Sequence, residues 1–165
     1  MKNTSGRSQL EETPVFFLDR TFGRYQVAQR LRDAGFVLRT LFEEFQEAES
    51  RIIDPVIIQH CGLMNRVLLT GDRDLMRTWN KEIIQAEIAV FITTENNEGP
   101  NAWVPRIIAA KDGILRELGR RQKPFTASIS KEGHVAQVRV YDGTQWKAIT
   151  IRKKNPSNYE RNRKK

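Results

Sequence analysis

The stretch VLLTGDRD, residues 67–74, is an apolar segment that ends abruptly in acidic residues. An earlier segment, VFFL at residues 15–18, ends in the same way, in Asp19. Short, fully apolar segments are typical of the buried strands of a parallel sheet. In an open parallel sheet, ligands bind where the strands stop at their carboxyl ends. The two segments therefore predict an α/β fold with several carboxylates around one point at the edge of its sheet.

The sequence around these segments alternates between helical and strand patterns. Apolar residues recur at helical spacing over 22–34, Gly35 supplies a stop, and residues 36–38 form a second apolar segment. Asp54 before Pro55 is a helix start signal, with the aspartate as N-cap and the proline at the first helical position. A helix over 73–86 and a strand over 89–93 are expected next. This alternation favours an α/β domain with a mostly parallel sheet.

The last third of the chain adds an amphipathic stripe and a hairpin. Apolar residues between Trp103 and Leu118 recur at helical spacing, and this stripe could face either the core or a partner. Residues 125–130 and 135–141 alternate like strands, and 131–134 fits a hairpin loop between them. We therefore expect a flexible N-terminus over 1–13, one domain over 14–142 and a basic C-terminal tail over 143–165.

The charge of the chain favours a polyanionic partner. Its 165 residues include 28 Lys and Arg against 20 Asp and Glu, a formal net charge of +8. Such an excess points to nucleic acid rather than to an acidic protein or a metabolite. Much of it lies near the C-terminus, where Arg152, Lys153 and Lys154 are expected to contact the nucleic-acid backbone.

The cysteine and hydropathy patterns predict a soluble, cytoplasmic protein. The single cysteine, Cys61, lies in an apolar run and is interpreted as a small buried hydrophobic residue. No apolar stretch approaches the about 20 residues of a membrane span, and the polar N-terminus lacks the apolar core of a signal peptide. No membrane partner is expected.

Four acidic residues, Asp19, Asp54, Asp72 and Asp74, are the candidate site. Clustered carboxylates are costly to keep ionised unless a divalent cation lies among them, and such hard oxygen ligands suit Mg²⁺ or Mn²⁺. Each residue also has a structural explanation: Asp19, Asp54 and Asp72 could cap helices, and Asp74 could be a favourable charge in a first turn.

The DxD pattern at a strand end has alternative interpretations. It also occurs in nucleotide-sugar transferases, where it holds a metal and a diphosphate, and strand-end aspartates can serve as phosphoacceptors. Both alternatives usually need further landmarks. The chain has no Gly-rich phosphate loop, and it has no early paired acids of the kind that a phosphoacceptor pocket needs.

At this point the chain resembles the PIN-like nucleases, and most closely the branch related to VapC-type toxins of bacterial toxin–antitoxin pairs. The resemblance covers about residues 15–135 and is carried by FLDR at 17–20, GFV at 35–37, Asp54 before a helix, and LLTGDRD at 68–74. It implies a three-layer sandwich with a mostly parallel central sheet and a C-terminal β-hairpin. Gly71 departs from the pattern, because a basic residue is common there, and Ile57 replaces a frequent aromatic residue.

The resemblance implies a metal-dependent endoribonuclease, the toxin of a toxin–antitoxin pair. By position, Asp19 and Asp72 would bind Mg²⁺ or Mn²⁺ directly or through water, and Asp54 and Asp74 would complete the site. RNA would be the substrate, an antitoxin encoded by an adjacent gene would be a protein partner, and a homodimer is expected.

Basic and aromatic residues would bind the RNA. Arg73 is a candidate contact, and Arg20 could contact a phosphate or pair with a nearby acid. Trp146 is a candidate for stacking on a base. Two alternatives stay open: a catalytically inactive RNA-binding module with the same fold, and a protein-interaction domain whose basic tail binds an acidic surface.

Overall fold

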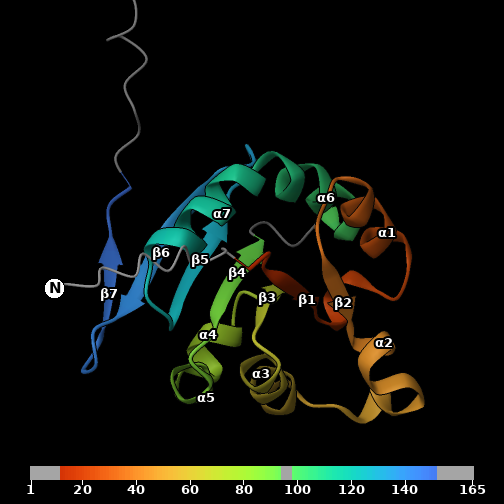
Figure 1. The fold of residues 1–165 in the computed structure, drawn as a ribbon, viewed down its shortest axis with the longest axis horizontal. Coiled ribbons are helices and arrows are strands. Elements are labelled where there is room, and N and C mark those ends of the chain that lie inside the picture. Colours follow the sequence, from red (N-terminus) through yellow and green to blue (C-terminus); the bar gives the residue numbers. More distant parts are fainter. Residues whose placement is uncertain (1–11, 94–97, 152–165) are drawn as a thin grey trace, which may run out of the picture.

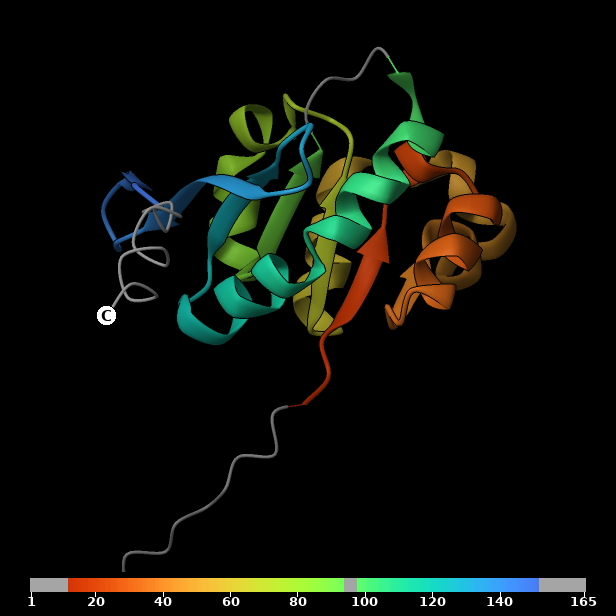
Figure 2. The same cartoon turned by 90° about the horizontal axis from the view of Figure 1, so that it is seen from above.

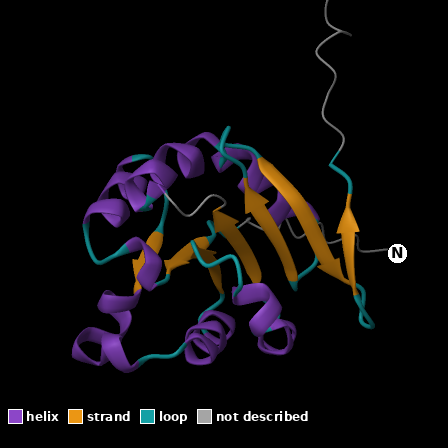
Figure 3. Cartoon of the chain, turned by 180° about the vertical axis from the view of Figure 1, so that it is seen from behind, coloured by secondary structure: helices purple, strands orange, loops and turns teal. Residues whose placement is uncertain are grey.

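The chain forms one seven-stranded mixed sheet. The computed structural model describes residues 12–93 and 98–151. The strands, in the spatial order β2-β1-β3-β4-β5-β6-β7, are β1 (Val15–Leu18), β2 (Leu38–Thr40), β3 (Arg66–Thr70), β4 (Ala89–Thr93), β5 (Phe125–Ile129), β6 (Val135–Tyr141) and β7 (Trp146–Ile149). Strands β1 to β5 pair in parallel, and β6 and β7 are antiparallel, so the predicted mostly parallel α/β sheet is confirmed (Figures 1 and 3).

Helices cover both faces of this sheet. Figures 1 and 2 show α1 (Gln26–Asp33), α6 (Pro100–Ala109) and α7 (Lys111–Arg120) on one face. The other face is covered by α2 (Leu41–Phe45), α3 (Asp54–Leu63), α4 (Leu75–Thr78) and α5 (Asn80–Ala86). The short 3-10 helices η1 (Arg20–Phe22) and η2 (Gln46–Arg51) lie in connections. The domain therefore has three layers.

The central strands are apolar on both sides because both sides are buried. In β1, Phe16 and Leu18 belong to a first core, which lies under α1, α6 and α7. Phe17 belongs to a second core, which lies under α3 and α5. Strand β3 alternates in the same way. Cys61 is fully buried in the second core, as predicted. The stripe from Trp103 to Leu118 supplies the first core and is divided between α6 and α7.

Two predicted boundaries are wrong, and local geometry explains both. Residues 36–38 were expected to form a strand, but Phe36 closes α1: its N–H donates to the Leu31 carbonyl at 3.0 Å, while Gly35 adopts φ +88°. This is a Schellman ending, and β2 starts only at Leu38. The helix expected over 73–86 is divided into α4 and α5 at Trp79, whose ring packs against the second core.

The predicted hairpin is confirmed, but the predicted tail begins too early. Strands β5 and β6 pair in antiparallel fashion, as expected. Residues 146–149, assigned to the tail, form β7 on the outer edge of β6, where Trp146 packs against Tyr141 with ring centroids 5.6 Å apart. The partly buried Trp146 ring also contacts the second core, which favours a structural role. Over the described ranges, no helix has the length and apolarity to cross a membrane.

Candidate functional site

The candidate site lies at the carboxyl ends of β1 and β3. The chain leads from β1 to β2 on one side and from β3 to β4 on the other. Strand β1 pairs with β2 on one side and with β3 on the other, so the boundary between β1 and β3 is a topological switch point. Ligand sites of open α/β sheets form at such points, outside the carboxyl ends of the strands. Asp19 follows the last residue of β1, and its N–H donates to the Leu69 carbonyl of β3 at 3.3 Å. Asp19 therefore lies beside Thr70, the last residue of β3.

The Asp19 carboxylate is buried and held by two threonines. The residue is 3% exposed. Its Oδ1 accepts hydrogen bonds from the Thr21 backbone N–H at 3.0 Å and from the Thr21 hydroxyl, and its Oδ2 accepts from the Thr70 hydroxyl. Asp19 also caps η1 through the Thr21 N–H, so its structural explanation holds as well. These bonds fix the orientation of the carboxylate.

The same threonines connect Asp19 to the turn after β3. The Gly71 N–H donates to the Thr21 hydroxyl oxygen at 2.9 Å, and the Asp72 N–H donates to the Thr70 hydroxyl oxygen at 3.0 Å. Asp19 and Asp72, 53 positions apart in the sequence, therefore lie at the same edge of the sheet. Sequence reasoning missed both threonines, although a threonine two positions from each acid was the signal that could have found them.

Burial raises the pKa of Asp19 from 3.8 to about 6. The hydrogen bonds from Thr21 and Thr70 act in the opposite direction, because they stabilise the ionised form. The negative charge of Asp54 adds to the rise, so Asp54 lies close enough for its charge to reach Asp19. An ionised Asp19 is therefore costly, and a bound cation would offset that cost.

Asp54 lies at the start of α3 but does not cap it, contrary to the sequence prediction. The N-cap is Ile53, with φ −93° and ψ 159°, and no side chain caps this helix end. Asp54 is the first helical residue and Pro55 the second. Asp54 is therefore a favourable charge in the first turn of α3 rather than its cap.

Asp72 and Asp74 have different surroundings. Asp72 is half-buried, and its Oδ1 accepts from the Asp74 N–H at 2.9 Å, which organises the turn before α4. The Asp74 side chain is 68% exposed and pairs with Arg77 at 2.7 Å. Asp74 therefore has an ion-pair role on the surface. Asp72 is connected to Asp19 through Thr70, and the charge of Asp54 reaches Asp19.

A cation at this site would be held by one or two carboxylates and would keep several of its waters. Among the residues that the structure describes, no three His, Cys, Asp or Glu side chains are grouped so that they could hold a metal ion. Mg²⁺ keeps several waters and is usually bound through only one or two carboxylates. Asp19, with Asp72 or Asp54 as a second carboxylate, fits that mode of binding.

Trp103 explains why a glycine follows Thr70. A Cβ atom on Gly71 would lie 2.4 Å from the Cη2 and Cζ3 atoms of the Trp103 ring. The ring is 4% exposed and packs edge-on against Phe22 with centroids 5.4 Å apart. A side chain at position 71 is therefore excluded by α6, and the basic residue expected from the family pattern has no room.

The basic candidates lie in several places. Arg20 is exposed, and its guanidinium donates to the Ile52 carbonyl rather than to an acid. Arg73 is exposed in the turn between Asp72 and Asp74. Arg152, Lys153 and Lys154 lie outside the described residues.

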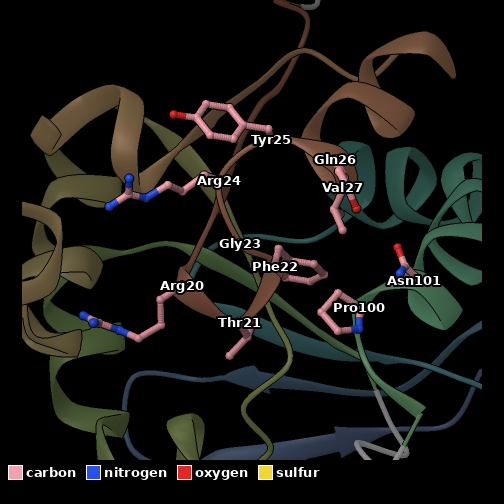
Figure 4. Close-up of a pocket in the computed structure, with 10 residues that line it drawn as sticks. All are labelled: Arg20, Thr21, Phe22, Gly23, Arg24, Tyr25, Gln26, Val27, Pro100 and Asn101. Atoms are coloured by element: carbon pink, nitrogen blue, oxygen red, sulfur yellow. The ribbon is translucent and has the colours of Figure 1, made fainter.

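A shallow depression of about 520 Å³ adjoins Asp19. It is lined by Arg20, Thr21, Phe22, Gly23, Arg24, Tyr25, Gln26, Val27, Pro100 and Asn101 (Figure 4). Sequence reasoning missed Arg24 and Tyr25, which share the loop between β1 and α1 with Arg20. The basic and aromatic residues directly after Asp19 were the available signal.

Comparisons with known proteins leave the family open. No protein-family model, no curated protein and no solved structure matches this chain.

Proposed function

We propose that this protein is a PIN-like, metal-dependent endoribonuclease that hydrolyses RNA phosphodiesters. The observation that carries the proposal is the buried Asp19 carboxylate, which two threonines hold at the β1/β3 switch point and connect to Asp72. A buried acid whose pKa is raised to about 6 at the ligand-binding edge of an α/β sheet is a functional-site candidate. The sequence resemblance to PIN-like nucleases points to the same residues.

The residues of the site have separate roles in this proposal. Asp19 and Asp72 hold Mg²⁺ or Mn²⁺ directly or through water, and the Asp54 charge contributes to the negative potential. When bound, the metal would activate a water for attack on a phosphodiester and offset charge on the phosphate oxygens. Thr21 and Thr70 fix the Asp19 carboxylate, so little reorganisation is needed on substrate binding.

The RNA backbone binds through basic residues. The net charge of +8 provides sequence-independent attraction for a polyanion. Arg20, next to Asp19, and Arg73, next to Asp72, flank the acids and would contact phosphates. Arg152, Lys153 and Lys154 would extend this contact, and binding should weaken steeply with salt.

The proposed biological setting is a toxin–antitoxin pair. In that setting an antitoxin encoded by a neighbouring gene would bind the protein and block cleavage, and the active form would be a homodimer. These assignments depend on the sequence resemblance. A small DNA-binding protein encoded immediately beside this chain would support them.

One observation favours a second candidate, an RNA-binding PIN-like module without activity. Both Asp19 oxygens already accept threonine hydrogen bonds, and Asp74 is paired with Arg77. The Asp19 and Asp74 carboxylates thus have protein partners without a metal ion. This candidate predicts salt-sensitive RNA binding with no cleavage.

Cleavage assays separate the two candidates. We expect a labelled RNA to be cut by the full chain in Mn²⁺ and left intact in excess EDTA. Asp19→Asn and Asp72→Asn should each abolish cleavage, whereas Asp112→Asn, which removes an exposed carboxylate on α7, should retain it. Metal-independent cleavage, or full activity of Asp19→Asn, would refute the nuclease proposal.

A further inference from the structure

Three exposed side chains of the loop after β1 extend in the same direction. Arg20, Arg24 and Tyr25 point away from Pro100 and Asn101, while Phe22 points toward Pro100 (Figure 4). We name these three residues the Arg-Tyr edge. It starts at the residue that directly follows Asp19.

Each member of the Arg-Tyr edge contacts the segment between β2 and α3. Arg20 donates to the Ile52 carbonyl, two residues before Asp54. Arg24 Nε donates to Glu49 Oε1 at 3.0 Å. The Tyr25 ring packs edge-on against Phe42, with centroids 6.0 Å apart. The Arg-Tyr edge therefore packs along the segment between β2 and α3, starting next to Asp19.

The Arg-Tyr edge offers an aromatic ring for a base and cations for phosphates, the two kinds of group that bind a single strand of nucleic acid. Tyr25 is 65% exposed, so its ring can stack on a base. The Arg24 guanidinium carbon lies 4.3 Å from the centre of the Phe42 ring, which orients its planar group. Among the described residues Arg20 makes no ion pair, because its partner is a neutral carbonyl, and its charge is available to a phosphate.

We infer that the Arg-Tyr edge binds single-stranded RNA next to the cleavage site, with phosphates on Arg20 and Arg24 and an unstacked base on Tyr25. This inference rests on the proposed nuclease function, because it names the substrate class of that site. A duplex is disfavoured, because its bases are stacked and paired and cannot reach the tyrosine ring.

A purely structural role for the edge makes a different prediction. If Arg24 only anchors η2 through Glu49, then removing either partner should lower stability and leave RNA affinity unchanged. If Arg24 binds RNA, the two variants should change affinity in opposite directions. Arg24→Gln removes a cation, whereas Glu49→Gln removes the anion that competes with phosphate for it.

The test measures binding of fluorescein-labelled U12 RNA and of a 12-base-pair RNA duplex to the full chain in EDTA, which prevents cleavage. Tyr25→Leu should weaken binding of the single strand about tenfold and leave duplex binding unchanged. Arg20→Gln and Arg24→Gln should each lower the slope of log K against log salt by about 0.7. Glu49→Gln should tighten single-strand binding by about two- to fivefold.

Matched controls lie on other elements, outside the loop after β1. Tyr141→Leu, on β6, and Arg116→Gln, exposed on α7, should leave both affinities unchanged. If Arg24→Gln does not fold, Tyr25→Leu and Glu49→Gln carry the test. Equal effects of Tyr25→Leu on single strand and duplex, or no tightening in Glu49→Gln, would overturn the inference. Metal-dependent cleavage is scored separately, so its absence counts against the proposed function and not against the binding edge.

Discussion

Replacing Asp19 with Asn should stabilise the metal-free protein at neutral pH. The Asp19 carboxylate is buried, and its pKa is raised from 3.8 to about 6. The folded protein therefore holds this proton more tightly than the unfolded chain does. The stability that comes from the neutral form is complete below pH 3.8 and is lost as the pH rises through 6. An asparagine has no proton to lose and avoids this penalty.

The expected magnitude follows from the size of the pKa shift. A rise from 3.8 to about 6 corresponds to about 3 kcal/mol in total, most of which is lost between pH 4 and pH 7. The asparagine can still accept from Thr21, and its amide can donate to the Thr70 hydroxyl oxygen, so most of the hydrogen bonds survive. With a urea m-value of about 2 kcal/mol/M, the midpoint of the variant at pH 7 should exceed that of the wild type by roughly 1–2 M.

The assay is urea unfolding of both proteins in EDTA from pH 4 to pH 8. The two urea midpoints should be similar at pH 4 and separate as the pH rises. The difference between them at each pH isolates Asp19, because the other titrating groups are common to both proteins. Adding Mg²⁺ at 100 times its dissociation constant should stabilise the wild type by about 2.7 kcal/mol and the variant much less. Asp112→Asn is the control for removing a charge. A wild-type-to-variant difference that does not change with pH, or a less stable Asp19→Asn at pH 7, would refute the reasoning.

Three further perturbations follow from the packing and capping described above. Gly71→Ala should lower the free energy of unfolding by about 1–3 kcal/mol, because its Cβ would lie 2.4 Å from the Trp103 ring, and an unchanged urea midpoint would contradict this. Thr40→Ala should cost about 1 kcal/mol by removing the capping box with Glu43 at the start of α2; equal thermal stability of the two proteins would argue against it. Burial lowers the pKa of His60 below 6.5, so stability that is complete above that value is lost as the pH falls; His60→Phe should remove this loss, and an NMR titration midpoint above 6.5 would be inconsistent with it.

The placing of Asp19 and Asp72 at the same edge of the sheet could be predicted from the sequence. Both follow short, fully apolar segments, and parallel strands that are buried on both faces bring their carboxyl ends to one edge. The partner of Asp19 on the neighbouring strand could not be predicted. Thr70 bonds to Asp19 because the β1–β3 register pairs Leu18 with Leu69, and a register is not visible in either strand alone. The bond from Thr21 is local, two positions along the chain.

Local helix geometry separates Asp74 from the other acids. Asp74 follows Asp72 by two positions, but α4 begins there and the Asp74 side chain pairs with Arg77, three positions on, at the surface. Arg24 and Tyr25 join the site only because the segment between β2 and α3 folds back to contact them.

The sequence by itself determined the α/β class, the buried central strands and the placing of two acids at strand ends, since these depend on local apolar patterns that specify which residues must leave water. The tertiary structure alone decided that Trp103 excludes a side chain at Gly71, that residues 146–149 add a strand, and that burial raises the pKa of Asp19. The physical reason is that close packing, strand pairing and desolvation depend on atoms contributed by segments far apart in the chain.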